Sequence, residues 1–168
     1  MTNVVAKPDK SIWYLAAAIA CIGAGQSTIF ILIPAEVRSL GFNEFEVGII
    51  FSISALAWMF FSPFWGSLSD KFGRKWIFLL GIFGFSISMI LFAAIISAAT
   101  LNLIPFALIL PLLIITRLIN GLLGSAVRPA AGGRIADLTS PETRAAGFAR
   151  FDAGWPVSYT HLTLPTTD

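Results

Sequence analysis

Uncharged stretches of membrane-spanning length constrain this chain more than any other feature. No Asp, Glu, Lys or Arg occurs within Trp76–Thr116, a stretch of about 41 residues. As one helix it would measure about 60 Å, roughly twice the 30 Å hydrocarbon core of a bilayer. The stretch therefore predicts two membrane-spanning helices, at about 76–98 and 104–127. Polar residues and a proline within Thr100–Pro105 mark the turn between them.

Two shorter uncharged stretches precede this one. They predict a first span at about 12–33, closed by Pro34, and a second at about 47–65. The start of a fifth is predicted at about 145–155. The chain is 57% hydrophobic and 12% charged, against about 25% charged residues in soluble domains. The predicted fold class is thus an all-α membrane protein with four transmembrane helices and the beginning of a fifth.

The basic residues predict the orientation of these spans. They gather in the amino-terminal tail (1–11), between spans two and three, and after span four, whereas Glu outnumbers Arg between spans one and two. By the positive-inside rule the amino terminus is cytoplasmic, and the chain is a multi-pass protein of the inner (plasma) membrane. Amphipathic aromatic rings at the predicted cytoplasmic ends indicate an interfacial belt: Trp13, Tyr14, Trp65 and Trp76.

A glycine-containing motif lies between the second and third predicted spans. Residues 66–76 read GSLSDKFGRKW, and they resemble the signature loop of the major facilitator superfamily, G-x-L-[AS]-D-[KR]-x-G-R-[KR]. The two glycines of the motif permit close approach of the backbone and turn conformations that side chains would block. The acid can cap a helix start, and the arginine offers planar donors to a carboxylate. The motif residues that we single out are Gly66, Asp70, Gly73, Arg74 and Lys75.

The resemblance implies a role for this loop in transport. In the family it latches the amino-terminal half to the carboxy-terminal half on the cytoplasmic side during alternating access. Asp137 matches the acid that partners the loop arginine, so we expect a network of Asp70, Arg74 and Asp137. The alternatives are an ordinary basic loop that contains glycines and, for Asp137, a solvated carboxylate.

A second motif lies in the fourth predicted span. Residues 117–126 read RLINGLLGSA, and they resemble the family's R-x-x-[QN]-G motif. Gly121 and the small residues after it predict close helix packing. Arg117, near the middle of its span, should face the bundle interior. Its expected partner is a backbone carbonyl, Gln26 or a residue outside this chain. The resemblance implies a role in proton coupling, and the alternative is a structural arginine.

The segment 134–144, RIADLTSPETR, resembles the cytoplasmic segment after span four in the drug:proton antiporter branch of the family. That branch includes tetracycline-type efflux pumps. The spacing between the two motifs is longer than that branch leads us to expect, through 97–107. Ser140–Glu142 also predicts the start of the next helix. The resemblance thus implies a twelve-helix fold, of which this chain supplies part of the amino-terminal six-helix half. The missing carboxy-terminal half would be its partner.

The leading functional hypothesis is proton-coupled efflux of small, largely apolar compounds. Candidate cavity residues are Gln26, Thr28 and Asn120, with interhelical hydrogen bonding as the alternative for each. Uptake of a sugar or organic metabolite is the alternative transport function, and a non-transporting fragment or membrane interaction subunit is the alternative of another class. Sequence motifs of hydrolases and nucleotide-binding enzymes are absent. We therefore expect no enzyme activity, no cofactor or metal, and no nucleic-acid partner.

The last residues read unlike a membrane protein. Residues 157–167, VSYTHLTLPTT, resemble the translation of a transposase-end sequencing adapter. We expect the natural sequence to depart near Trp155 and 156–168 to be a non-native tail, so His161 is assigned no role. A genuine polar carboxy terminus is the alternative.

Overall fold

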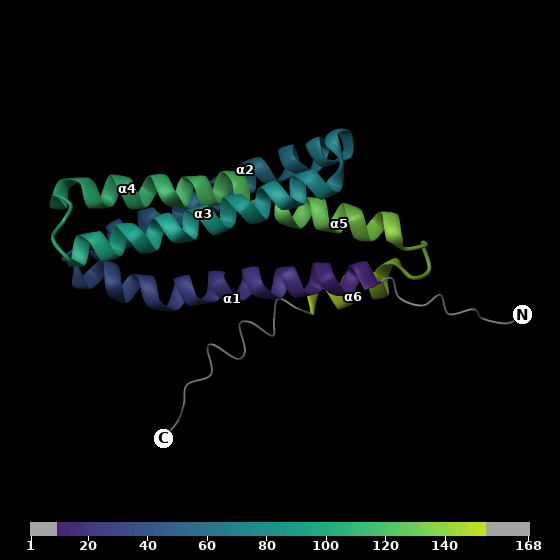
Figure 1. Ribbon diagram of the computed structural model, residues 1–168, viewed down its shortest axis with the longest axis horizontal. Helices are drawn as coiled ribbons and strands as arrows, with labels where there is room; N and C mark the ends of the chain where they lie inside the picture. Colours follow the sequence, from purple (N-terminus) through teal and green to yellow (C-terminus); the bar gives the residue numbers. More distant parts are fainter. Residues whose placement is uncertain (1–9, 154–168) are drawn as a thin grey trace, which may run out of the picture. The chain divides into compact units, whose positions relative to one another are not determined.

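The computed structural model describes residues 10–153, which form helices and turns without a strand (Figure 1). The helices are α1 (Lys10–Ser39), α2 (Glu44–Phe72), α3 (Arg74–Thr100), α4 (Phe106–Ile119), the π-helix η1 (Asn120–Gly124), α5 (Val127–Leu138) and α6 (Arg144–Asp152). Four helical stretches are long and apolar enough to cross a membrane: Ile12–Ser39, Glu44–Phe72, Arg74–Thr100 and Phe106–Leu138. The predicted all-α membrane fold class is confirmed.

The chain forms two compact units. The larger unit, Ile29–Arg134, contains the end of α1, all of α2, α3, α4 and η1, and the first part of α5. The described residues of the second unit are the start of α1, up to Thr28, and the segment from Ile135, which contains the end of α5 and α6. Both motifs predicted from the sequence lie in the larger unit.

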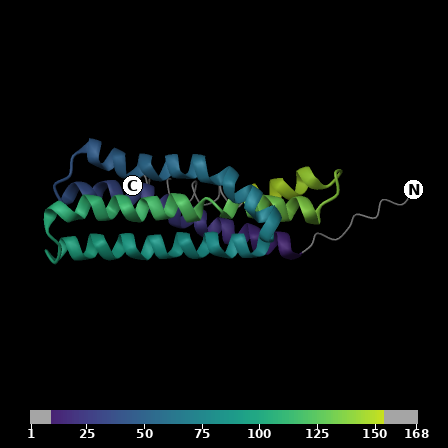
Figure 2. The same cartoon turned by 90° about the horizontal axis from the view of Figure 1, so that it is seen from above.

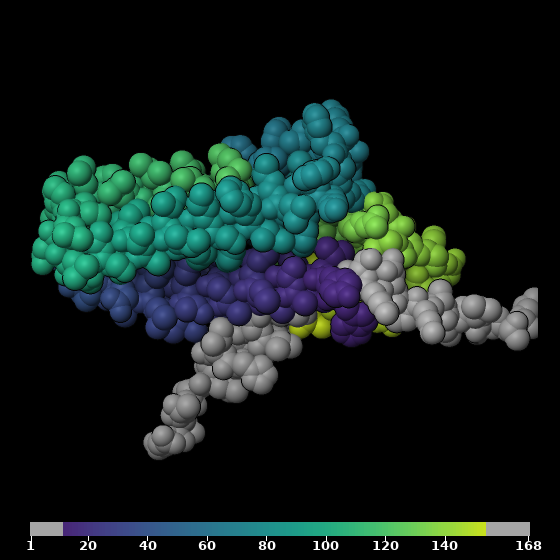
Figure 3. All heavy atoms as spheres, in the orientation of Figure 1, coloured from purple at the N-terminus to yellow at the C-terminus, as the bar shows by residue number. Residues whose placement is uncertain are grey.

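Within the larger unit α2, α3 and α4 lie side by side along most of their length (Figures 1 and 2). The space-filling view shows α3 and α4 forming a continuous surface near the turn that joins them (Figure 3). Aliphatic and aromatic side chains from these helices, from the end of α1 and from the connection between α1 and α2 form the core: Ile29, Ile33, Val37, Phe42, Val47, Ile50, Phe92, Ala99, Ile109 and Leu113. Burial of these side chains holds the unit's helices together.

The start of α2 is fixed by a capping box. The Asn43 side chain accepts a hydrogen bond from the Glu46 backbone at 3.0 Å, and the Asn43 backbone donates to the Glu46 carboxylate at 2.8 Å. This reciprocal pair satisfies two backbone donors of the first turn. The helix therefore begins at Glu44, three residues before the predicted span.

The first helix continues through Pro34, so the prediction that this proline closes it is wrong. A proline cannot donate the i→i−4 hydrogen bond, which usually weakens a helix interior. Here the residues on both sides are anchored, because Ile33 and Val37 are buried in the core of the larger unit. Packing therefore carries α1 to Ser39 despite the missing bond.

The turn between α3 and α4 lies where the sequence predicts it. Helix α3 ends at Thr100, Asn102 adopts a positive φ of 56°, and Pro105 is the N-cap of α4. Asparagine tolerates the left-handed conformation better than most residues, and proline suits a helix start because its missing N–H needs no partner there.

The fourth helical stretch is longer than the predicted 104–127. It passes from α4 into η1 and, after a turn, into α5, which ends at Leu138. Helix α6 starts at Arg144 with Thr143 as its N-cap, and the Thr143 Oγ1 accepts a hydrogen bond from the Ser140 backbone at 3.1 Å. The predicted start signal 140–142 thus precedes a helix.

Several predictions fall outside the described residues. These concern residues 1–9 of the predicted cytoplasmic tail, the end of the predicted fifth span, and the proposed non-native tail 156–168 with His161. They stay predictions, as do the membrane boundaries of the four spans.

Candidate functional site: an acid–arginine pair and a buried arginine

The first motif is almost entirely helical, which corrects the prediction of a loop over 66–76. Helix α2 runs to Phe72 and α3 starts at Arg74, so Gly73 alone separates them. Gly73 has φ 95° and ψ 131°, a conformation that side chains strongly disfavour, and its N–H donates to the Ser69 carbonyl at 3.1 Å. The predicted turn role of Gly73 is confirmed.

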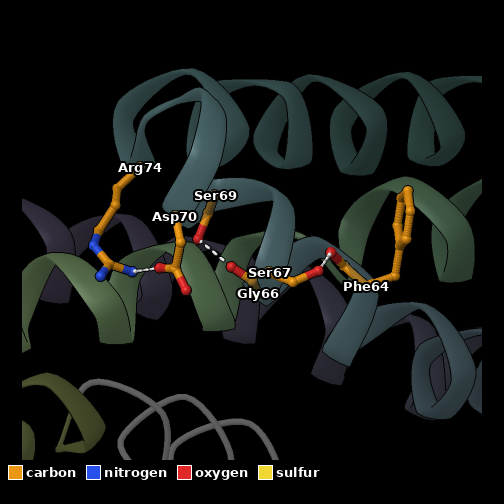
Figure 4. A network of polar contacts seen from close by, with 6 residues as sticks. All are labelled: Phe64, Gly66, Ser67, Ser69, Asp70 and Arg74. Atoms are coloured by element: carbon orange, nitrogen blue, oxygen red, sulfur yellow. Dashed lines mark hydrogen bonds and ion pairs between the residues drawn. The ribbon is translucent and has the colours of Figure 1, made fainter.

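Asp70 and Arg74 form an ion pair across this junction (Figure 4). The Arg74 Nη1 lies 2.8 Å from the Asp70 Oδ1, and the side chains are 25% and 61% exposed, respectively. Asp70 lies in the last turn of α2 and does not cap α3, whose N-cap makes no side-chain hydrogen bond. The expected capping role of Asp70 is therefore wrong, because the helix continues further than predicted and Arg74 takes the carboxylate.

The other two motif residues, Gly66 and Lys75, have less crowded surroundings. Gly66 lies inside α2, where its carbonyl accepts a hydrogen bond from the Ser69 hydroxyl at 2.8 Å (Figure 4). A Cβ added at Gly66 would lie 3.6 Å from the Pro129 Cβ, an ordinary contact distance. The expectation that Gly66 permits an unusually close approach or a turn is therefore wrong. Lys75 is exposed on the first turn of α3.

Asp137, the expected third member of the network, is exposed in α5. It belongs to the second compact unit, whereas Asp70 and Arg74 belong to the larger one. The pair is thus observed, and the participation of Asp137 stays a prediction.

Arg117 faces inward, as predicted for a charge in a membrane span. Only 2% of it is exposed. Its guanidinium carbon lies 5.6 Å from the ring centroid of Phe51 in α2 and 6.0 Å from that of Phe92 in α3. Among the described residues its Nε finds no hydrogen-bond partner. Two aromatic faces therefore provide cation–π contacts, which the sequence alone does not predict.

Asn120, one turn further along the same helix, joins α2 to α3. The Ser54 Oγ donates to its Oδ1 at 3.3 Å, and its Nδ2 donates to the Ser88 Oγ at 3.1 Å. Asn120 is completely buried. This geometry is that of interhelical hydrogen bonding, the alternative considered for this residue.

Glycines allow the helices to approach closely around this bridge. A Cβ added at Gly121 would lie 2.5 Å from the Ala57 Cβ and 2.6 Å from the Ser54 carbonyl oxygen. Real Cβ atoms do not come so close, so the predicted packing role of Gly121 has a direct steric basis. Gly81 and Gly84 of α3 are similarly crowded by Val127 and Leu123, although neither glycine belongs to a motif in the sequence.

The helix that carries Arg117 widens into the π-helix η1 directly after Ile119. Such turns are rare, bond residue i to i+5, and often lie at functional sites. The Trp65 Nε1 donates to the Leu122 carbonyl within η1 at 2.6 Å, and Trp65 is 8% exposed. Trp65 therefore packs against another helix and does not join the predicted interfacial belt. Trp13, Tyr14 and Trp76 are exposed.

The remaining candidate cavity residues lie in the second unit. The Thr28 Oγ1 donates to the Ala24 carbonyl of its own helix at 2.9 Å. The Gln26 Oε1 is buried and has no hydrogen-bond partner among the described residues. Within residues 10–153 no group of His, Cys, Asp or Glu is arranged to hold a metal ion.

Four long apolar helices, with an acid–arginine pair where the second meets the third, define a polytopic membrane protein. The family profile described as "Major Facilitator Superfamily" matches residues 15–162. The chain therefore belongs to the major facilitator superfamily of membrane transporters, as its two motifs indicate. The match reaches into the segment 156–168.

Relatives named for drug resistance align with most of the chain. It is 30% identical over 145 residues to the quinolone resistance protein NorA of Staphylococcus aureus, covering 86% of this chain and 34% of NorA. It is 37% identical over 119 residues to the multidrug resistance protein MdtG of Proteus mirabilis, covering 68% of this chain and 26% of MdtG. The chain thus spans about a third of the length of NorA.

Proposed function

We propose that this chain is part of a secondary active transporter that exports small, largely apolar compounds across the inner (plasma) membrane in exchange for protons. The observation that carries the proposal is the Asp70–Arg74 ion pair at the α2–α3 junction of a major facilitator chain. The names of the relatives, which refer to quinolone and multidrug resistance, favour efflux over uptake of a sugar or organic metabolite.

The ion pair suits a cytoplasmic latch because it is strong enough to orient two side chains and weak enough to open. Asp70 is more than half exposed, and such pairs contribute about 0–1 kcal/mol. Alternating access requires contacts that break in every cycle. In this proposal Asp137 offers Arg74 a second carboxylate, and the carboxy-terminal half of the transporter is the surface that the latch engages. The amino terminus is cytoplasmic.

Arg117 is the proposed coupling residue. A cation at this depth costs about 2.5–3.5 kcal/mol on insertion scales, and its aromatic surroundings leave Nε without a hydrogen bond among the described residues. A carboxylate that approaches Arg117 would be held in its ionised form, and withdrawal would favour its protonation. Gly121 supports this role by keeping the helix against α2. Gln26 and Thr28 stay the candidate cavity residues in this proposal, whereas the hydrogen bonds of Asn120 to Ser54 and Ser88 favour an interhelical role.

The test uses the whole transporter, obtained by reading the source DNA beyond codon 156. Everted membrane vesicles are energised with a proton gradient, and uptake of a fluorescent quinolone is followed with and without a protonophore. We expect uptake that the protonophore abolishes. Asp70→Asn should lower it severalfold at equal protein level, while Asp70→Glu, which keeps the carboxylate, should retain most of it.

Each outcome has a distinct meaning. Uptake that is insensitive to the protonophore would refute proton coupling. Normal uptake by Asp70→Asn would refute the latch. A reading frame that ends at Asp168 would refute the longer transporter and lead instead to a search for a partner subunit.

A further inference from the structure

We propose that Gly133 is a positioning residue that holds the guanidinium of Arg74 beside Asp70. Arg74 is the first residue of α3, and Gly133 lies in α5 within the same compact unit. A Cβ on Gly133 would occupy the space of the Arg74 guanidinium. It would overlap Nη1 and Cζ and lie 2.9 Å from Nε. The guanidinium therefore rests directly on the α5 backbone, at a position where any side chain would displace it.

The crowding at Gly133 differs in kind from that at the packing glycines. At Gly121 a Cβ would meet a backbone oxygen and a short side chain, which cannot move without moving a helix. At Gly133 the three nearest atoms all belong to the end of one flexible side chain. A methyl group there would therefore displace the Arg74 side chain first. Such a movement takes the Arg74 Nη1 away from the Asp70 Oδ1, which lies 2.8 Å from it.

The absence of a side chain at Gly133 thus provides a flat surface for a planar cation. Glycine permits this close approach to the backbone, and arginine offers a planar group that fits it. The signature motif over 66–76 gives no indication of residue 133. The bearing of Gly133 on transport rests on the proposed latch, whereas its effect on the position of Arg74 does not.

The experiment measures the reactivity of individual arginines in this chain, purified in detergent micelles. Phenylglyoxal modifies accessible guanidinium groups, and mass spectrometry of peptides quantifies modification at each arginine. Gly133→Ala should raise the modification rate of Arg74 severalfold, toward the rate in Asp70→Asn, where the ion pair is removed. Arg38, paired with Glu44 at 2.7 Å, should react at an unchanged rate. Buried Arg117 should stay protected, which shows that the helices remain packed.

Gly48→Ala is the matched control, because Gly48 is helical and a Cβ there meets nothing within 4 Å. It should leave the reactivity of Arg74 unchanged. An unchanged Arg74 rate in Gly133→Ala, with Arg117 protected, overturns the proposal. If Gly133→Ala exposes Arg117 to phenylglyoxal, the modification of Arg117 is measured again in the double variant Gly133→Ala/Arg74→Ala. Restored protection of Arg117 supports a steric conflict between the added methyl group and the Arg74 guanidinium. Continued exposure of Arg117 overturns the proposal.

The reactivity of Arg74 and the transport assay can fail separately. A raised Arg74 rate together with normal transport by Asp70→Asn would leave Gly133 as a positioning residue and refute the latch. An unchanged Arg74 rate together with impaired transport by Asp70→Asn would retain the latch and refute the role of Gly133.

Discussion

The indole nitrogen of Trp65 lies 2.6 Å from the carbonyl oxygen of Leu122 and donates a hydrogen bond to it. The same oxygen accepts a bond from the Ser125 Oγ at 3.0 Å. Two side chains from different places in the sequence thus donate to one carbonyl of the π-helical turn. Trp65 therefore ties α2 to the irregular part of the fourth helical stretch.

Trp65→Phe should lower the free energy of unfolding by about 1 kcal/mol, the typical net value of one hydrogen bond. The loss stays modest because Ser125 still donates to the carbonyl. Ser125→Ala alone should cost little for the same reason. The double variant should lose more than the sum of the two, because the oxygen then loses both side-chain donors. Denaturant titration in mixed micelles measures all three, and strictly additive losses would contradict this account.

Gly121→Ala should destabilise the chain by about 1–3 kcal/mol, the usual range for overpacking. The added methyl would meet the Ala57 Cβ at 2.5 Å and the Ser54 carbonyl at 2.6 Å. Gly48→Ala, where the methyl group enters open space, should be neutral or slightly stabilising because alanine favours helices. The same titration compares them, and equal effects would show that Gly121 does not set the distance between the helices.

Asn120→Ala should cost about 0.6 kcal/mol for each interhelical hydrogen bond that it removes, the average for such bonds in a membrane protein, whose largest value is about 1.7 kcal/mol. It removes the acceptor of Ser54 and the donor to Ser88 at once. Ser54→Ala and Ser88→Ala should each cost less, because Asn120 then keeps one partner. A double-mutant cycle between positions 88 and 120 should give a favourable coupling energy. A coupling energy of zero would mean that the 3.1 Å contact contributes nothing.

The start of α6 should weaken in acid. A hydrogen bond with the Ser140 side chain, helped by one from its own backbone, lowers the pKa of Glu142 below its ordinary value of 4.5. A depressed folded-state pKa stabilises the fold above the unfolded pKa, and the contribution is lost as the pH falls through the lower value. Hydrogen exchange of the α6 amides should accelerate as the pH falls below 4.5, after correction for intrinsic rates. Glu142→Gln should remove this pH dependence, and a variant that retained it would implicate another group.

The features that the sequence predicts well are those set by local composition. Uncharged stretches define membrane-length helices, because a bilayer allows few alternatives. The break between α3 and α4 follows from the length of Trp76–Thr116. The inward orientation of Arg117 follows from the cost of exposing a charge to lipid, and the positive φ of Gly73 follows from the conformational freedom of glycine in a turn.

The features that the sequence predicts poorly depend on contacts between distant segments. The sequence predicts Trp65 at the interface because it ends an apolar run, whereas its hydrogen-bond partner Leu122 lies on another helix. Helix α1 passes Pro34 because of core packing that no local pattern reveals. Phe51 and Phe92 read as ordinary apolar residues, and only the arrangement of α2 and α3 around Arg117 makes them its partners.

Gly73 alone joins two helices of 29 and 27 residues. A connection of one residue offers two soft torsions, φ and ψ, and both are committed to the turn. The connection therefore cannot absorb a movement of one helix relative to the other. If the middle of α2 tilts, the leading turn of α3 must follow or Gly73 must change its torsions. Arg74, the first residue after Gly73, would be the first residue of α3 that such a tilt displaces.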